Sequence, residues 1–514
     1  MRATIHLDTQ HHAGPVDRRI FGGFLEHLGR AVYGGVYDPG NPLSDERGFR
    51  RDVLDALRPL AFSVMRYPGG NFVSAYDWTD GIGPREARPR RPDFAWKSVE
   101  TNQSGTDEFL AWCRALGAAP MLAVNLGTGT PARAAHLLEY CNLPAGTSWA
   151  DRRAANGHPE PYGVALWCLG NEMDGPWQAG HAPAEVYGRQ ARMASALMKG
   201  LDPTIQTVAC GSSGRGMGSY LEWDRTVLEI AWDTVDFISA HRYSGNWGGD
   251  SASYLAEGVE IDRILADYAG LLAYVRGVKK SAKRVYLSFD EWNVWYRARG
   301  DDGNWAEAPP LLEEVYNLED ALVCAQYLMA FLRRADLVKV ACLAQVVNVI
   351  APVLTRPDGV LLQTIYWPFA LIAASARGIA LAPAITAPTY TTAHYGEVPA
   401  LDAAATYDAE AGTLALFLVN RDRAALTVEI AVADAALGAV LHADLLTGEP
   451  HAANTWEAPR AVLPSPGRAE VVDGRLRVTA PGTSFMAVRA KVRTAPAGRS
   501  AIVSPADAAS APTA

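Results

Sequence analysis

The 514-residue chain has few cysteines, and their spacing excludes the roles that clustered cysteines usually have. There are six, and no two of them form a Cys-x-x-Cys pair. A disulfide framework or a thiolate-bound metal would need paired or clustered cysteines. Most of the six lie in apolar segments, so we expect buried free thiols in a reducing compartment. We also expect no metal and no other cofactor.

Excess positive charge and long apolar runs are missing too. The net charge of −9 argues against nucleic acid or an anionic membrane as the main partner. No uncharged run approaches the length of a membrane span, and residues 1–8 lack the apolar core of a secretory signal. We therefore predict a cytoplasmic protein whose substrate is imported as small pieces.

Most of the chain alternates between apolar segments typical of buried strands and segments with helical periodicity. Eight such pairs follow one another between residues 14 and 378. Strands are predicted at 20–27, 62–67, 120–126, 164–169, 207–211, 235–241, 285–289 and 338–347, and helices at 49–60, 106–116, 131–140, 183–201, 220–232, 262–279, 318–335 and 364–376. Eight pairs with polar residues at the strand ends favour a (β/α)₈ TIM barrel over a doubly wound α/β sheet.

The pattern changes after residue 378. Short strands at 401–407, 413–419, 426–431, 440–446, 475–479 and 484–488 are separated by Gly, Asp, Asn and Pro. They predict a jelly-roll-like all-β sandwich over 379–491. The weak alternation of residues 1–13 predicts a strand that joins this sandwich, and the low-complexity segment 492–514 is predicted to be a disordered tail.

Two of the predicted barrel strands end in glutamates. Asn171 and Glu172 follow the fourth strand, and Asp290 and Glu291 follow the seventh. Strands four and seven lie on opposite sides of a barrel mouth, where barrel enzymes keep their active sites. Two carboxylates about 5–5.5 Å apart hydrolyse a glycosidic bond with retention of configuration. The pair therefore predicts a retaining glycosidase.

The two glutamates need different surroundings. Glu172 should hold a proton, with its pKa raised by burial and by the charge of Glu291. Glu291 should be ionised and needs hydrogen-bond donors, for which Tyr243 and His241 after the sixth strand are candidates. Asn171 can donate to a sugar 2-hydroxyl as charge develops.

Structural roles compete with these interpretations. A single carboxylate after a strand is more often a helix cap or an ion-pair partner, but two of them together favour catalysis. Asp290 should point to the opposite face of its strand from Glu291, and we expect it to be a structural partner behind the barrel wall. Arg66 either holds Glu172 or Glu291 in place or contacts substrate. Other strand ends bring further polar groups to the mouth, among them Glu26, Asn71 and Gln345.

The longest motifs resemble those of one enzyme family. They cover residues 24–35, 66–73, 167–178, 241–243, 287–296 and 345–352. Together they are similar to the intracellular-type α-L-arabinofuranosidases of glycoside hydrolase family 51, over a stretch from about residue 20 to the end of the sandwich.

This resemblance implies a function and a set of site residues. Glu172 would be the general acid/base and Glu291 the nucleophile, with Arg66 and His241 in support. The arabinofuranose would be bound in the −1 subsite by Glu26, Asn71, Asn171, Tyr243 and Gln345. The enzyme would release terminal non-reducing α-L-arabinofuranosyl residues from arabinoxylan- or arabinan-derived oligosaccharides, without a cofactor and as a homohexamer.

Two alternatives stay open. The same constellation also serves β-xylosidases and endo-glucanases, and a pocket closed by the segment 297–310 would favour exo action over endo action. A non-catalytic sugar-binding protein is the second alternative. A decayed site of that kind would have lost a carboxylate, and this chain keeps both.

Overall fold

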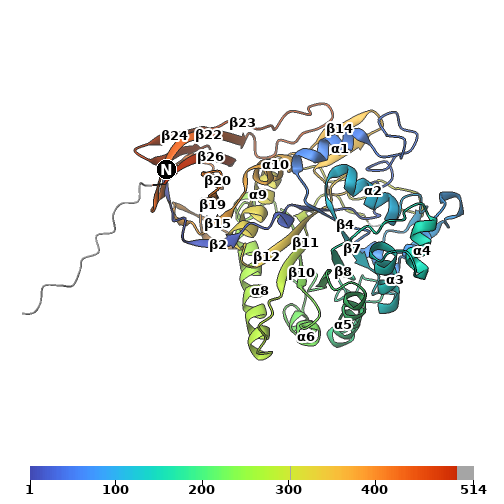
Figure 1. The fold of residues 1–514 in the computed structure, drawn as a ribbon. Helices are drawn as coiled ribbons and strands as arrows, with labels where there is room; N and C mark the ends of the chain where they lie inside the picture. Colours follow the sequence, from blue (N-terminus) through green and yellow to red (C-terminus); the bar gives the residue numbers. More distant parts are fainter. Residues whose placement is uncertain (301, 495–514) are drawn as a thin grey trace, which may run out of the picture.

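The computed structural model describes residues 1–300 and 302–494, and its centre is a closed barrel of parallel strands (Figure 1). In chain order the barrel strands are β3 (Gly22–Phe24), β4 (Val64–Tyr67), β7 (Ala119–Val124), β8 (Leu166–Leu169), β9 (Gln206–Ala209), β10 (Phe237–Ser244), β11 (Tyr286–Val294) and β12 (Val338–Ala344). Each pairs with the next and β12 closes on β3. The predicted (β/α)₈ barrel is confirmed.

One helix follows each barrel strand and covers the outside of the barrel. In order these are α1 (Arg51–Leu57), α2 (Thr106–Leu116), α3 (Pro131–Asn142), α5 (Ala184–Leu201), α6 (Glu222–Ala231), α8 (Gly258–Val278), α9 (Leu318–Arg333) and α10 (Tyr366–Ser375). The short helices α4 (Ser148–Ala155) and α7 (Ser251–Tyr254) are additions that the sequence pattern did not indicate. Three hairpins also decorate the loops: β5 (Arg91–Asp93) with β6 (Ser98–Glu100), β13 (Val353–Arg356) with β14 (Gly359–Leu362), and β17 (Thr389–Thr392) with β18 (Gly396–Pro399).

The barrel strands read as continuous apolar runs because both of their faces are buried. In β8, Leu166 and Cys168 belong to the cluster inside the barrel, whereas Trp167 and Leu169 belong to the larger cluster between strands and helices. A parallel strand with helices outside and packed side chains inside has no solvated face. All six cysteines are likewise buried and free, as expected.

The second unit is a twelve-stranded sheet. Its strands are β1 (Arg2–Leu7), β2 (His12–Pro15), β15 (Ile379–Leu381), β16 (Ala384–Thr386), β19 (Leu401–Asp408), β20 (Thr413–Asn420), β21 (Leu426–Val432), β22 (Ala435–Thr447), β23 (Ser465–Pro466), β24 (Arg468–Val472), β25 (Arg475–Ala480) and β26 (Ser484–Thr494). Ile5 of β1 and Leu416 of β20, whose strands are separated by β21, β22 and β26 in the sheet order, share one buried cluster. The sheet therefore encloses a core of its own, as a sandwich does.

Both ends of the described part of the chain contribute to this sheet. β1 pairs in parallel with β21, and β2 pairs with β15, so the N-terminal segment supplies two strands rather than one. β26 continues to Thr494, so residues 492–494 of the expected tail are strand. The rest of the expected tail, 495–514, lies outside the described residues.

The sheet packs against the barrel helices. β20 is buried along its whole length because Leu416 and Leu418 face the sheet core, whereas Phe417 and Val419 join the barrel cluster. Arg333 of α9 binds Asp402 of β19 at 2.9 Å across this boundary.

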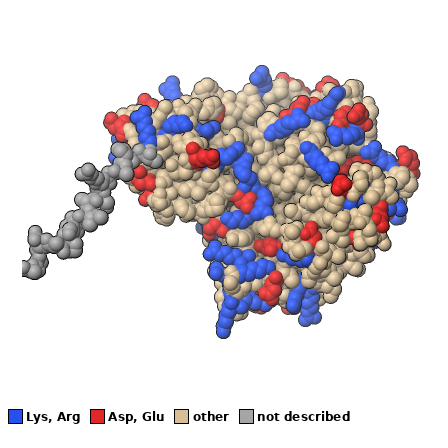
Figure 2. All heavy atoms as spheres, viewed as in Figure 1, with Lys and Arg blue, Asp and Glu red and all other residues tan. Residues whose placement is uncertain are grey.

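The surface is mixed in charge. Figure 2 shows basic and acidic side chains interspersed over one face of the molecule. Within residues 1–300 and 302–494, no helix combines the length and hydropathy needed to cross a bilayer.

Candidate active site

The end of β8 turns sharply before it presents Glu172. Gly170 has φ of +94°, which favours glycine, and Glu172 itself has a left-handed φ of +43°. A glutamate in this region is uncommon, and such backbone occurs often at functional sites. The turn brings Oε1 of Glu172 to 2.9 Å from Nδ1 of His241 on β10.

The end of β11 contains an irregularity that changes which side chains face the mouth. Ser239 of β10 pairs with Ser288, but His241 pairs with Glu291, so β11 has one more residue than β10 in this stretch. Such a bulge breaks the alternation of side chains along a strand. Asp290 and Glu291 both reach His241 as a result: Oδ1 of Asp290 lies 2.9 Å from Nε2, and Oε2 of Glu291 lies 3.6 Å from Nδ1. The expectation that Asp290 lies behind the barrel wall is wrong.

His241 is therefore surrounded by three carboxylates. Its burial disfavours the charged imidazolium, but Glu291, Asp290 and Glu172 outweigh that cost and raise the pKa of His241 to about 10. At neutral pH the ring then carries protons on both nitrogens. Sequence reasoning placed His241 beside Glu291, whereas its shorter contact is with Glu172.

Arg66 of β4 holds the opposite side of Glu291. It is 1% exposed, and its Nη1 donates to Oε1 of Glu291 at 2.7 Å. Of the two roles considered, contact with a carboxylate is the one observed. Tyr243 donates to the other oxygen of Glu291 at 2.9 Å. Glu291 thus accepts a hydrogen bond from a guanidinium on one carboxylate oxygen and from a phenol on the other.

Arg66 also orients Asn171. Nη2 of Arg66 donates to Oδ1 of Asn171 at 2.8 Å, which fixes the amide with its NH₂ group turned away from the arginine. That NH₂ lies 3.5 Å from Oε1 of Gln178, a long contact that a stronger acceptor could replace. Gln178 in turn binds Ser74.

Glu26 and Gln345 form a second polar group at the mouth. Oε1 of Glu26 accepts from the Phe72 backbone at 3.0 Å and from the Trp96 indole at 3.1 Å. Gln345 accepts from the backbone of Glu26 at 2.9 Å. Burial raises the pKa of Glu26 to about 8, against the hydrogen bond from Phe72.

Asn71 opens the 3₁₀ turn Asn71–Ala75, next to this group. The turn approaches Glu26 so closely that a Cβ on Gly70 would lie 2.4 Å from Oε2 of Glu26. Asn71 is half-buried, and its carbonyl accepts from Gln178 at 3.4 Å. All nine residues singled out from the sequence therefore lie around one barrel mouth.

Two tryptophans at the site were not among the residues predicted from the sequence. Trp177 donates its indole N–H to Oε2 of Glu172 at 2.8 Å, although its side chain is 52% exposed. Trp96 lies between β5 and β6 and contacts Glu26. Trp177 lies in the motif 167–178 and could have been found there, but nothing local in the sequence marks Trp96.

Glu172, His241 and Glu291 are also close enough together to act as ligands of one metal ion, and they are the group of this kind within the described residues. One atom each of Glu172, His241 and Glu291 lie within 4.8 Å of one another. Oε1 of Glu172 lies 2.9 Å from Nδ1 of His241, so these two members of the cluster are hydrogen-bonded to each other.

A closed barrel with glutamates at the ends of its fourth and seventh strands is the arrangement of a glycoside hydrolase. Comparison with known proteins gives the family. Residues 56–257 match the α-L-arabinofuranosidase 1 domain, and residues 290–484 match the α-L-arabinofuranosidase C-terminal domain. The chain belongs to the family 51 α-L-arabinofuranosidases.

Individual relatives agree with this assignment. The chain is 46% identical over 429 residues to an intracellular exo-α-(1→5)-L-arabinofuranosidase of Acetivibrio thermocellus, covering 82% of this chain and 85% of that protein. It is 44% identical over 504 residues to an exo-α-(1→6)-L-arabinofuranosidase of Bifidobacterium longum, covering 94% and 96%. A solved family 51 α-L-arabinofuranosidase from Bifidobacterium longum superposes with a TM-score of 0.90 at 42% identity, covering 95% of this chain and 99% of that one.

Proposed function

We propose that this protein is an exo-acting, retaining α-L-arabinofuranosidase with Glu172 as acid/base and Glu291 as nucleophile. The observation that carries the proposal is the convergence of both carboxylates on Nδ1 of His241, with one oxygen of each within 4.8 Å of the other. Retaining glycosidases hold their carboxyl groups about 5–5.5 Å apart, and inverting enzymes about 6.5–9.5 Å. The short separation leaves no room for a water between sugar and nucleophile.

In the first step a protonated Glu172 gives its proton to the glycosidic oxygen. The bond from that oxygen to the anomeric carbon breaks, a bond from Glu291 to the same carbon forms, and the leaving group departs as an alcohol. In the second step Glu172 takes a proton from water. The water oxygen bonds to the anomeric carbon and Glu291 leaves as a carboxylate.

The surroundings of the two glutamates suit these roles. Arg66 and Tyr243 donate to the two oxygens of Glu291, which orients this carboxyl group for attack on the anomeric carbon. The oxygen of Asn171 is taken by Arg66, and its NH₂ group has only a long 3.5 Å contact with Gln178 that a sugar 2-hydroxyl could replace. Glu26, Asn71 and Gln345 would bind the remaining hydroxyls of the arabinofuranose.

The loops favour a pocket over an open groove. The backbone N–H of Gly303 donates to the Trp96 carbonyl at 2.9 Å, and that of Trp305 donates to the Lys97 carbonyl at 2.7 Å. These bonds join the loop after β11 to the β5–β6 hairpin and place Trp96 against Glu26. A wall on this side supports release of terminal arabinofuranosyl units rather than internal cleavage.

The relatives' names extend the proposal. These names specify (1→5) linkages for one relative and (1→6) linkages for another. We therefore propose oligosaccharides from arabinan or arabinoxylan as substrates without choosing one linkage. Several are called intracellular, which supports a cytoplasmic enzyme. We further propose that the catalytic barrel spans residues 14–378 and the β-domain residues 379–491. We also propose that the protein is a homohexamer, which light scattering would test.

Azide rescue tests the assignment of the two glutamates. With 4-nitrophenyl α-L-arabinofuranoside, Glu291→Ala plus azide should form the β-azide, because azide attacks from the face that the nucleophile occupied. Glu172→Ala plus azide should form the α-azide, because azide attacks the glycosyl–enzyme intermediate. The reverse pattern, or β-configured arabinose as the first product of the wild-type enzyme by NMR, would overturn the proposal.

A further inference from the structure

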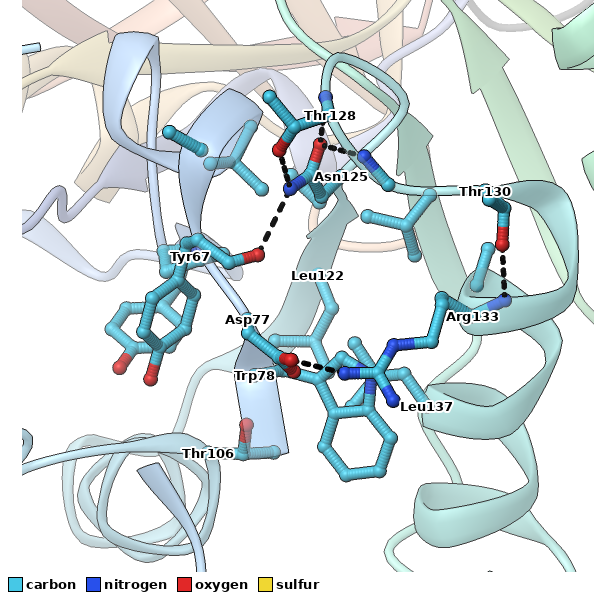
Figure 3. Close-up of a pocket in the computed structure, with 18 residues that line it drawn as sticks. Tyr67, Asp77, Trp78, Thr106, Leu122, Asn125, Thr128, Thr130, Arg133 and Leu137 are labelled. Carbon is cyan, nitrogen blue, oxygen red and sulfur yellow. Dashed lines mark hydrogen bonds and ion pairs between the residues drawn. The ribbon is translucent and has the colours of Figure 1, made fainter. Parts of the chain in front are cut away.

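A cavity lies beside the barrel strands β4 and β7 (Figure 3). It has a volume of about 190 Å³ and lies between β4, β7 and the helices α2 and α3. None of the nine residues proposed for catalysis and sugar binding lines it. A cavity of about 150 Å³ with apolar walls can hold a benzene molecule, so this one has room for a single substituted ring.

The walls are mainly apolar and aromatic. Tyr67, Trp78, Leu122 and Leu137 line the interior, and the labelled side chains in Figure 3 surround one hollow. Exposed polar residues such as Thr128 and Thr130 stand at the rim.

Most polar groups of the lining already have partners. Oδ1 of Asn125 accepts from the backbones of Gly127, Thr128 and Gly129, each at 3.0 Å. The Tyr67 hydroxyl lies 2.7 Å from His27, and Arg133 is paired with Asp77. These groups offer little to a ligand with many hydroxyls.

Two side chains of the described lining are exceptions: Trp78, whose indole N–H is buried without a hydrogen-bond partner, and Thr106. This first residue of α2 is 3% exposed, and its hydroxyl points into the cavity in Figure 3. No hydrogen bond joins that hydroxyl to any other described residue. Buried polar groups are normally paired, so an unpaired hydroxyl and an unpaired indole N–H in the lining of a mainly apolar cavity suit a ligand with few polar atoms.

We propose that this cavity is a binding site for a small single-ring phenol. The ring would lie against Tyr67 and Leu122, and its hydroxyl would form a hydrogen bond with Thr106. A pentose would fit less well, because its several hydroxyls would meet only the Thr106 hydroxyl and the Trp78 indole N–H as unpaired groups of the described lining and would lose the rest of their hydration.

The site is joined to the proposed catalytic pocket by the turn Asn71–Ala75. Val73 and Ala75 line the cavity, whereas the Phe72 backbone binds Glu26 on the other side. Ser74 of the same turn binds Gln178, which contacts Asn171. An occupied cavity should therefore change the KM for an arabino-oligosaccharide. This consequence rests on the proposed function, whereas binding of phenol does not.

Binding is tested by calorimetric titration of the full chain with phenol and with toluene. Wild-type protein should bind phenol saturably and more tightly than toluene, and its Tm should rise with phenol concentration. Thr106→Val keeps the shape and removes the hydroxyl. Phenol should then bind about fivefold more weakly, as expected for one lost hydrogen bond, with toluene binding unchanged. Without ligand this variant should be at least as stable as wild type.

A filled cavity gives an independent test. Ala134 of α3 is buried in the lining, and Ala132 is exposed on the same helix. Ala134→Phe should abolish phenol binding, and the matched Ala132→Phe should leave it intact, with folding of both checked by circular dichroism. Absence of saturable phenol binding in wild type, equal binding in a folded Ala134→Phe, or an unchanged phenol affinity in Thr106→Val would each overturn the proposal. A loss of hydrolysis in Glu291→Ala with phenol binding intact would support the cavity site separately from the catalytic assignment.

Discussion

The two proposed catalytic glutamates reach one imidazole from strand ends that are built differently. Glu172 lies on a left-handed turn after the short strand β8, and its side chain is 12% exposed. Glu291 lies within the longer, bulged β11, and its side chain is 7% exposed. Arg66 and Tyr243 hold Glu291, whereas an exposed indole holds Glu172. Two carboxyl groups with different roles need different surroundings.

Replacing each glutamate by glutamine should give the largest effects and should separate the two roles. Glu291→Gln should lower kcat about 10⁵-fold for every substrate, because no intermediate can form. Glu172→Gln should cost about 10³-fold with an oligosaccharide, whose leaving group needs a proton, but about tenfold with a 4-nitrophenyl glycoside in the first step. Single-turnover kinetics with both substrates measure this difference.

The matched control is Glu410→Gln, at an exposed position of the β-domain. It should leave both rates unchanged. An equal dependence on the leaving group in the two site variants would mean that the asymmetry between the strand ends does not correspond to different roles.

His241, whose imidazole contacts both Glu172 and Glu291, should make the free energy of unfolding depend on pH. The pKa of His241 rises from 6.5 to about 10 on folding, so the folded protein binds the proton more tightly. Its contribution is full below pH 6.5 and is lost as the pH rises through 10, on the order of 5 kcal/mol in all. Urea unfolding between pH 6.5 and 10 should show this slope in wild type and a shallower one in His241→Gln. His6→Gln, an exposed site in β1, should keep the wild-type slope, and identical slopes in all three would refute the linkage.

The same comparison shows what the sequence could and could not predict. The end of β8 was predictable, because an apolar run stops at a glycine and polar residues follow. β11 was predicted to end at residue 289 because Asp290, Glu291 and Asn293 interrupt its apolar run, yet the strand continues to Val294. Polar residues inside a strand at the barrel mouth look like a strand end in the sequence.

The position of Asp290 was mispredicted for a related reason. Alternation along a strand assumes regular pairing, and a bulge appears only when the partner strand is known. Contacts such as that of Trp96 with Glu26 join segments about 70 residues apart and depend on loop geometry that no local pattern encodes. The helix α4 was missed because most of its residues are polar or exposed.

Asp290→Asn should lower kcat about 100-fold with little change in KM, because Asp290 acts through His241 rather than on the sugar. Asp290 helps to raise the pKa of His241, so the alkaline limb of the pH–rate profile should also move to lower pH. Ser288→Ala removes a 3.1 Å contact to the other oxygen of Asp290 and is the control, with a much smaller effect. A large rise in KM or an unmoved alkaline limb would contradict the positioning role.

Trp177→Phe should have the smallest effect, about fivefold in kcat for an oligosaccharide. It removes the N–H that binds Glu172 and keeps an aromatic ring, and a hydrogen bond this exposed competes with water. The loss should vanish in the Glu172→Gln background, which a double-mutant cycle measures. If Trp177→Phe costs as much in that background as in the wild-type enzyme, the indole acts on the leaving group directly. The difference between the two strand ends would then come from the backbone turn around Glu172 rather than from the hydrogen bond that Glu172 accepts from Trp177.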